Sequence, residues 1–145
     1  MDWMQGRVRQ FHRAMGLTVN DSPTWPSVGE QGLRVDLIDE EAEEFVRAVR
    51  DHDMVDVADA LADLLYVVYG AAATFGIDIQ PVFDEVHRSN MAKVGGRRRE
   101  DGKILKPEGW QPPDIAPILK RQGWSERAAD GEDQNEEVDT DVRHQ

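Results

Sequence analysis

The sequence predicts an all-α fold, and three observations lead to that prediction. Apolar residues recur at the three- and four-residue spacing of a helix in four successive segments between residues 3 and 91. No segment alternates with the two-residue period of a strand, and turn or capping residues separate the segments. With 145 residues the chain is long enough for one domain with a modest core. We therefore expect a four-helix bundle.

The first two helices are expected on either side of a loop. Val8 and Phe11 stand at helical spacing and predict a helix over 3–15. Two prolines favour a loop over 17–28. A second helix is predicted over 30–50, where apolar and acidic residues share an amphipathic pattern.

The third segment is unusually apolar. Asp53 is a good N-cap for a helix over 54–75, and nearly every residue from Val55 to Tyr69 is apolar apart from three aspartates. A helix of this kind should be buried on several sides. A single copy would leave part of it uncovered, so we expect a homodimer that completes the bundle.

A fourth helix is predicted over 78–91, because an aspartate and a proline at its start favour a helical N-terminus. The following stretch, 95–113, is rich in glycine, proline and basic residues and is expected to be an ordered loop. A short helix over 114–121 should follow.

The domain is expected to span residues 1–122. Residues 123–145 contain eight acidic and two basic residues with few large apolar ones, which predicts a disordered acidic tail.

Composition excludes several classes of function. The chain has 29 acidic and 17 basic residues and a formal net charge of −12, which disfavours binding to nucleic acids or anionic membranes. It contains no cysteine, so a metal must be held by oxygen or imidazole ligands. Neither a secretory signal nor an apolar run of about 20 residues is recognised, so we expect a cytoplasmic protein that does not span a membrane.

Two acidic clusters are the strongest functional signal. At about 100° per residue, Glu41 lies on the same side of its helix as Leu37 and Phe45, where a soluble helix should be apolar. Glu40 and Glu44 stand beside it. A carboxylate that faces a core must be neutralised, and oxygen ligands suit Mg²⁺ and Mn²⁺. We expect these glutamates to bind such an ion, the alternative being an ordinary solvated acidic face.

The second cluster consists of Asp56, Asp59 and Asp63, which form a stripe about 60° wide on the apolar third helix. Asp63 is expected to face the glutamates from this neighbouring helix. The two clusters could then hold one or two ions, with water and substrate phosphate oxygens as the remaining ligands, and Glu40 could instead act as general base on the attacking water.

Basic and amide side chains further along the chain are candidates for phosphate contacts. Asn90 and Lys93 are i, i+3 neighbours at a helix end, and together they suit a phosphate chain, although helix capping by Asn90 would explain them equally well. Arg97 and Arg98 belong to a dense basic patch that could close over polyphosphate or simply be a solvated loop.

Aromatic and histidine residues offer weaker candidates. Tyr66 and Trp25 could stack on a nucleobase, though aromatic residues are more often part of a core or an interface. Asp84 and His87 form one carboxylate-x-x-histidine pair of the type seen in di-iron bundles, but such a site needs two pairs.

Three motifs together resemble the MazG-like all-α nucleoside triphosphate pyrophosphohydrolases. These motifs are Glu40-Glu41-x-x-Glu44, the sequence Ala-Leu-Ala-Asp-Leu-Leu-Tyr over 60–66, and Asn90-x-x-Lys93. The resemblance covers about 7–119 and looks greatest for the branch similar to phosphoribosyl-ATP pyrophosphohydrolase. The superfamily also includes the dimeric all-α dUTPases.

The resemblance implies an activity and a set of site residues. Members of the superfamily cleave between the α- and β-phosphates of a nucleotide and release a monophosphate and pyrophosphate, using Mg²⁺ or Mn²⁺. The implied metal ligands are Glu40, Glu41, Glu44 and Asp63. The implied phosphate contacts are Asn90 and Lys93.

One position departs from the family pattern. The family has a glutamate three residues before the aspartate, where this chain has Ala60. Asp56, one turn before Ala60, and Asp59, one residue before it, lie about 20° and 40° from Asp63 around the helix. Both are possible substitutes, since aspartate is an equally good oxygen donor.

These observations favour a metal-dependent nucleoside triphosphate pyrophosphohydrolase that acts on a deoxynucleotide, such as dUTP, or a non-standard nucleotide. Two alternatives stay open: a phosphoribosyl-ATP pyrophosphohydrolase of histidine biosynthesis, and a non-catalytic helical dimer that acts as an interaction protein.

Overall fold

A computed structural model of the chain describes residues 3–125. The helices in this range are α1 (Trp3–Ala14), α2 (Val28–Asp51), α3 (Met54–Thr74), α4 (Ile79–Met91) and α5 (Ala116–Arg121). No strand occurs between residues 3 and 125; the nearest approach to one is an isolated bridge between Arg98 and Ile104. The predicted all-α fold class is therefore confirmed.

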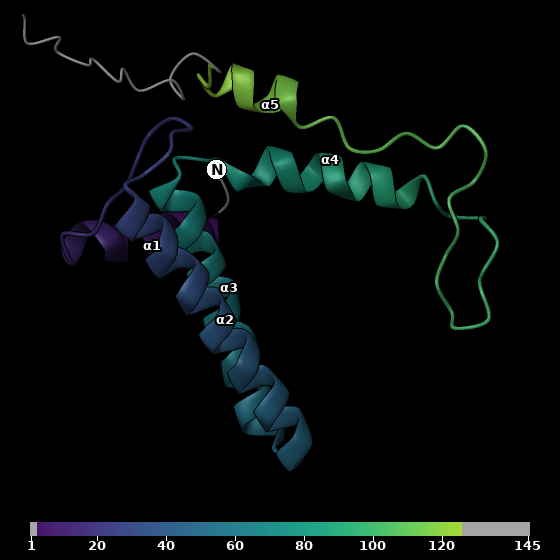
Figure 1. Cartoon of the computed structure of the whole chain (residues 1–145), viewed down its shortest axis with the longest axis horizontal. Coiled ribbons are helices and arrows are strands. Elements are labelled where there is room, and N and C mark those ends of the chain that lie inside the picture. Colours follow the sequence, from purple (N-terminus) through teal and green to yellow (C-terminus); the bar gives the residue numbers. More distant parts are fainter. Residues whose placement is uncertain (1–2, 126–145) are drawn as a thin grey trace, which may run out of the picture.

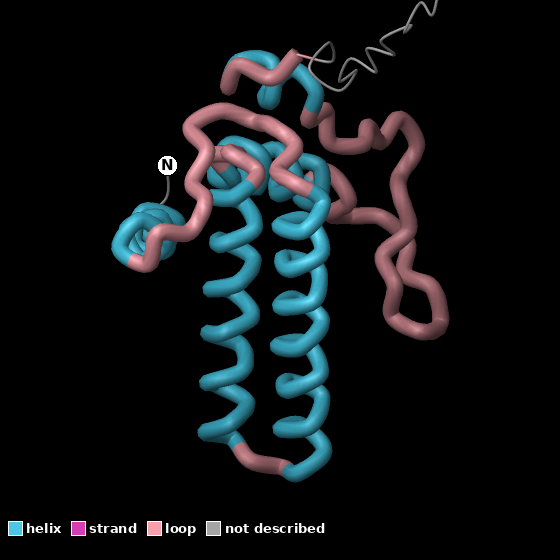
Figure 2. The backbone as a smooth tube through the Cα atoms, turned by 60° about the vertical axis from the view of Figure 1, so that its left-hand side comes forward, coloured by secondary structure: helices cyan, strands magenta, loops and turns pink. Residues whose placement is uncertain are grey.

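The two longest helices, α2 and α3, form an antiparallel hairpin (Figures 1 and 2). At its tip His52 adopts a left-handed conformation (φ 56°) and ends α2, while the Asp53 side chain accepts hydrogen bonds from the backbone N–H groups of Val55 and Asp56. The predicted N-cap of α3 is thus confirmed. At the other end, a capping box between Ser27 and Glu30 starts α2 two residues before its predicted start.

Helix α1 packs against α3 near the open end of the hairpin (Figure 1). The fully buried Gln5 fixes this arrangement: its Nε2 donates to the Ile77 carbonyl at 2.6 Å, and its Oε1 accepts from the Ile79 N–H at 3.1 Å. These two bonds join α1 to the connection between α3 and α4. The same connection contains Gly76 at φ 70°, where a Cβ would collide with the Ser22 carbonyl.

Helix α4 leaves the hairpin and runs away from it (Figure 1). The loop after α4 returns alongside this helix, because Trp110 Nε1 donates to the Ser89 carbonyl at 2.8 Å and the Asp114 N–H donates to Glu85 at 2.9 Å. This is the ordered loop that the sequence predicts. Beyond α5, Trp124 still packs near Leu119; residues 126–145, most of the predicted acidic tail, lie outside the described residues.

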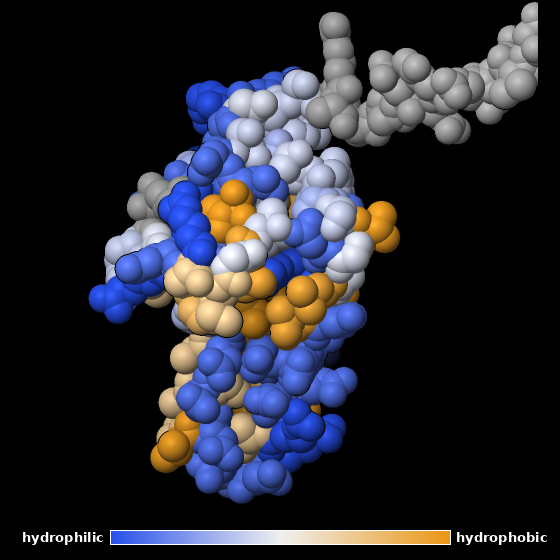
Figure 3. All heavy atoms as spheres, turned by 90° about the vertical axis from the view of Figure 1, so that its left-hand side faces the viewer, coloured by the Kyte–Doolittle hydropathy of each residue, from blue (hydrophilic) through white to orange (hydrophobic). Residues whose placement is uncertain are grey.

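The apolar core within the described chain is small. Its buried apolar residues are Val8, Ala48, Ala60, Ala72, Ala73 and Ile118. Many larger apolar side chains are exposed, and Figure 3 shows apolar patches above the largely hydrophilic lower end of the hairpin. Between residues 3 and 125, four helices do not close into a bundle around a common core, and completion by dimerisation stays a prediction.

Helix α3 has the most uncovered apolar surface. By length and composition alone it would be able to cross a membrane, a property that core helices of soluble proteins share. Only 28% of its most apolar window is buried within the chain. The apolar residues Met54, Leu61, Leu65 and Val68 are all exposed and form a stripe about 60° wide.

Candidate functional site

The antiparallel α2–α3 hairpin brings the two predicted acidic clusters together. Glu41 on α2 feels the charges of both Asp63 and Asp59 on α3, in addition to its helix neighbours Glu40 and Glu44. Burial, followed by these four carboxylates, raises the pKa of the Glu41 carboxyl above its ordinary value. The prediction that Asp63 faces the glutamates from the next helix agrees with this arrangement.

Glu41 also has an unmatched acceptor. Its Oε2 atom is buried and has no hydrogen-bond partner. A buried carboxylate oxygen without a donor is costly, and the cost falls when a cation or a proton neutralises it. Among the carboxylates of this hairpin, Glu41 is therefore the one that a bound cation or proton would stabilise most.

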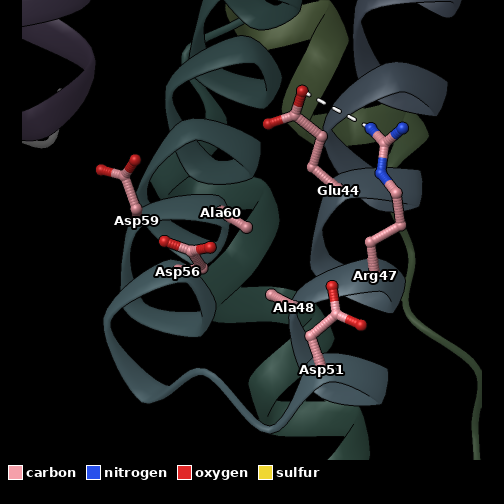
Figure 4. A pocket seen from close by; sticks show the side chains of 7 residues that line it. All are labelled: Glu44, Arg47, Ala48, Asp51, Asp56, Asp59 and Ala60. Atoms are coloured by element: carbon pink, nitrogen blue, oxygen red, sulfur yellow. Dashed lines mark ion pairs between the residues drawn. The ribbon is translucent and has the colours of Figure 1, made fainter.

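An open hollow of about 500 Å³ lies beside this cluster, between α2 and α3 (Figure 4). Asp56 and Asp59 line it from α3, whereas Glu44 and Asp51 line it from α2. The cation in the lining is Arg47, whose guanidinium lies 3.6 Å from the Glu44 carboxylate. The hollow is thus strongly acidic and suits a ligand that carries positive charge.

The floor of this hollow explains the departure from the family pattern. Ala60 is only 5% exposed and lies with the equally buried Ala48, so the two helices pack through small side chains there. Asp59 both lines the hollow and acts electrostatically on Glu41, whereas Asp56 only lines the hollow. Asp59 is therefore the better placed substitute for the carboxylate that Ala60 lacks.

The donor set fits a hard divalent cation in its chemistry, since it consists of carboxylate oxygens and includes the orphaned Glu41 Oε2. The side chains are not already gathered around one point: within residues 3–125 no three acidic or histidine residues stand at metal-binding spacing. Metal binding stays a prediction.

The predicted phosphate contacts lie elsewhere. Lys93 Nζ donates to Asn90 Oδ1 at 2.7 Å and stands 5.3 Å from the centre of the Trp110 ring. Because α4 runs away from the hairpin, the described chain does not bring this pair to the acidic cluster (Figure 1). Arg97 and Arg98 lie in the hairpin-shaped loop after α4, where the Arg97 carbonyl accepts from the Leu105 N–H at 2.7 Å.

The two aromatic candidates differ in position. Tyr66 is one turn from Asp63 on α3, 41% exposed, and makes an edge-to-face contact with Phe11. Trp25 packs edge-to-face on Phe75, twelve residues beyond Asp63 or about 18 Å along the helix axis. The described chain therefore does not bring Trp25 to the acidic cluster. Asp84 and His87 are both exposed on α4 and form no metal-binding group within residues 3–125.

Sequence reasoning missed two groups of residues at the hairpin. Asp51 and Arg47 line the hollow although they belong to the polar side of α2. Arg34 and His12 are buried to 7% and 3% exposure at the open end of the hairpin. Arg34 could have been identified from the sequence, because it stands two turns before Glu41 on the same apolar side of α2.

Two comparisons with known proteins match parts of this chain. The sequence pattern of a family described as phosphoribosyl-ATP pyrophosphohydrolase matches residues 8–90, more than half of the chain. An uncharacterized protein, L479, of Acanthamoeba polyphaga mimivirus is 49% identical over 47 residues. That match covers 32% of this chain and only 19% of the viral protein.

Proposed function

Because the chain belongs to the phosphoribosyl-ATP pyrophosphohydrolase family, within the MazG-like all-α superfamily, we propose that it is a metal-dependent nucleoside triphosphate pyrophosphohydrolase. The family is one of pyrophosphohydrolases, which act on phosphoric anhydride bonds. The proposed substrate is a deoxynucleoside triphosphate, such as dUTP, or a non-standard nucleotide, and the proposed products are the monophosphate and pyrophosphate.

The observation that supports this function most is the buried, unpartnered Oε2 atom of Glu41 within a group of carboxylates from two helices. Glu41, Glu44, Asp63 and Asp59 would hold Mg²⁺ or Mn²⁺ through oxygen atoms. When bound, such an ion activates a water molecule and screens the charge that develops on the phosphates. Glu40, exposed beside Glu41, is placed either to hold a second ion or to accept the proton of the attacking water.

The remaining phosphate contacts would come from a second copy of the chain. Asn90 and Lys93 lie at the far end of α4, away from the acidic cluster of their own chain (Figure 1). The exposed stripe that contains Leu61 and Leu65 on α3 offers an apolar surface for a partner helix. We expect Leu65→Glu to give a monomer in sedimentation experiments, and a monomeric wild-type protein would contradict the proposed homodimer.

The test of activity is to incubate the purified protein with a panel of nucleoside and deoxynucleoside triphosphates and Mg²⁺ or Mn²⁺. Release of monophosphate and pyrophosphate from a subset of the panel is the expected result. Asp63→Asn should abolish turnover, because it removes a proposed metal ligand, whereas Asp84→Asn on the exposed side of α4 should not. Equal rates in these two variants, or no turnover by the wild-type protein, would contradict the proposal.

A second candidate, phosphoribosyl-ATP, has equal support, since it is the substrate for which the matched family is named. The same product assay with that compound separates the two candidates. The third candidate function is that of a non-catalytic helical dimer. The absence of nucleotide binding, both with and without metal, would favour it.

A further inference from the structure

A second hollow, of about 180 Å³, lies between α1 and α3. It shares no lining residue with the acidic hollow between α2 and α3. Its lining includes Met4, Arg7 and Val8 from α1 and Ala62, Tyr66 and Tyr69 from α3. Apart from the Arg7 guanidinium and the two tyrosine hydroxyls, the side chains around it are apolar or aromatic. The hollow therefore suits an aromatic group better than a phosphate or a metal ion.

The size of this hollow limits what it can hold. Sites for ligands of drug size measure about 300–1,000 Å³, so a hollow of about 180 Å³ accommodates one flat ring system and not a whole nucleotide. The rest of a larger ligand would lie outside it, along the surface of α3.

Tyr66 supplies an accessible aromatic ring at this hollow. Its side chain belongs to a residue that is 41% exposed, and Phe11 holds the ring from α1 in an edge-to-face contact, with 5.7 Å between the ring centroids. A ring that a neighbour already holds loses little side-chain entropy when a base stacks on it. Tyr69, about one turn further along α3, is less exposed and lines the same hollow.

The register of α3 relates the hollow to the acidic cluster. Tyr66 follows Asp63 by three residues, which is about 4.5 Å along the axis and 60° around it. It follows Asp59 by seven residues, two turns along nearly the same side of the helix. A ligand whose phosphates lie at the carboxylates can therefore extend along α3 and place an aromatic ring in the hollow.

We propose that the hollow between α1 and α3 binds the heterocyclic base of the substrate, with Tyr66 as the ring on which the base stacks. This inference rests on the proposed function. The base is either that of a nucleoside triphosphate or the adenine of phosphoribosyl-ATP. Because the lining offers few hydrogen-bonding groups, the hollow distinguishes bases by size more than by the groups on their edges.

The first variant fills the hollow without removing a contact. Ala62 is exposed and lines the hollow, so Ala62→Leu places a larger side chain within it. Ala58→Leu is the matched control, because Ala58 is exposed one turn earlier on α3 and does not line the hollow. Ala62→Leu should raise KM about tenfold, and more for purine than for pyrimidine nucleotides, whereas Ala58→Leu should keep the wild-type KM.

The second pair of variants tests the stacking ring. Tyr66→Leu should raise KM about tenfold or more, as expected for the loss of a base–aromatic stack, with kcat within about twofold. Tyr66→Phe keeps the ring and should restore the wild-type KM. Inorganic tripolyphosphate, which has no base, should inhibit all these variants with the wild-type inhibition constant, since a base subsite does not act on it.

The substrate identifies the base. A higher KM of Ala62→Leu for nucleoside triphosphates assigns the hollow to their base, and an increase confined to phosphoribosyl-ATP assigns it to the adenine of that compound. Equal KM values in Ala62→Leu and Ala58→Leu would overturn the proposal, as would an equal loss of tripolyphosphate inhibition. Leu65 also lines the hollow and belongs to the exposed stripe of α3, so each variant is sedimented as well. A change in sedimentation of Ala62→Leu with an unchanged KM would show that a second copy fills the hollow, and would also overturn it.

Failure of the proposed function gives a different result. A wild-type protein without turnover would refute the activity, yet calorimetry with deoxyuridine monophosphate and adenosine monophosphate would still test the hollow. Both should bind more weakly to Ala62→Leu than to Ala58→Leu, and equal binding or no binding to either would refute the base subsite. If Tyr66→Leu does not fold, Ala62→Leu carries the comparison, since it adds atoms at an exposed position of α3.

Discussion

Replacing Glu41 by glutamine should stabilise the metal-free protein, although it removes the central residue of the proposed site. Glu41 is held beside four other carboxylates, and its pKa is raised because the folded state disfavours its charge. The amide has nearly the same shape and no charge. A catalytic site that is strained in this manner trades stability for function.

The expected gain follows from the number of carboxylates. A like-charge pair one helical turn apart, such as Glu41 and Glu44, costs about 0.2–0.5 kcal/mol. If the adjacent Glu40 and the two aspartates on α3 each cost a similar amount, the four carboxylates together give roughly 1–2 kcal/mol at low salt. Screening by water favours the lower end, about 1 kcal/mol. The buried oxygen without a partner contributes nothing to the difference, because glutamine places a polar atom at the same position. For a domain of this size the change corresponds to a rise in Tm of about 4 °C.

The assay is thermal unfolding by circular dichroism in EDTA at low salt, with Glu43→Gln as control because Glu43 is exposed and does not act on Glu41. The advantage of Glu41→Gln should be greatest above the raised pKa and should vanish below the ordinary value near 4.5, where Glu41 is protonated in both states. Mg²⁺ at a hundredfold excess over Kd should stabilise only the wild-type and control proteins, by about 2.7 kcal/mol. A lower Tm for Glu41→Gln than for Glu43→Gln in EDTA would refute the reasoning.

The other predictions concern packing and pH. Gly70→Ala should lower stability by about 1 kcal/mol, because its Cβ would press on His12, while Gly32→Ala, with nothing within 4 Å, should raise it by about 0.5–1 kcal/mol; a higher Tm for both would contradict this. The hydrogen bonds from Arg88, and then from the backbone of the returning loop, lower the pKa of Glu85 from 4.5 to about 2. Stability from Glu85 is therefore present above pH 4.5 and lost as the pH falls to 2, so the Tm difference between wild type and Glu85→Gln should disappear over that interval.

The fold could be predicted from the sequence wherever local chemistry decides it. Asp53 caps α3 because its side chain reaches the first free N–H groups, and this preference depends on neighbouring residues only. The course of α4 could not be predicted in the same way. It is fixed by contacts distant in sequence, such as Gln5 with Ile77, which no periodicity records.

The same distinction between local and long-range contacts applies to the residues of the candidate site. The charge of Glu41 on an apolar helix side was visible in the sequence, because helical geometry places each residue relative to its neighbours. Arg34 stands on that side too, but its burial depends on the packing of His12 from α1 and Gly70 from α3 against it, and the missing partner of its Nε depends on the same packing. Both are properties of three helices in contact, and only the structure contains them.

The position of Ala60 shows how an acidic site can persist when a usual ligand is absent. A long side chain at position 60 would point into the contact with Ala48, where the two helices pack through small residues. Asp59, one residue earlier, avoids that contact and still acts on Glu41 from the wall of the hollow. A carboxylate displaced by one position is therefore compatible both with close packing of the hairpin and with a place near the proposed metal ligands. On this argument, the proposed role of Asp59 follows from Ala60, the same small residue that makes the motif look incomplete.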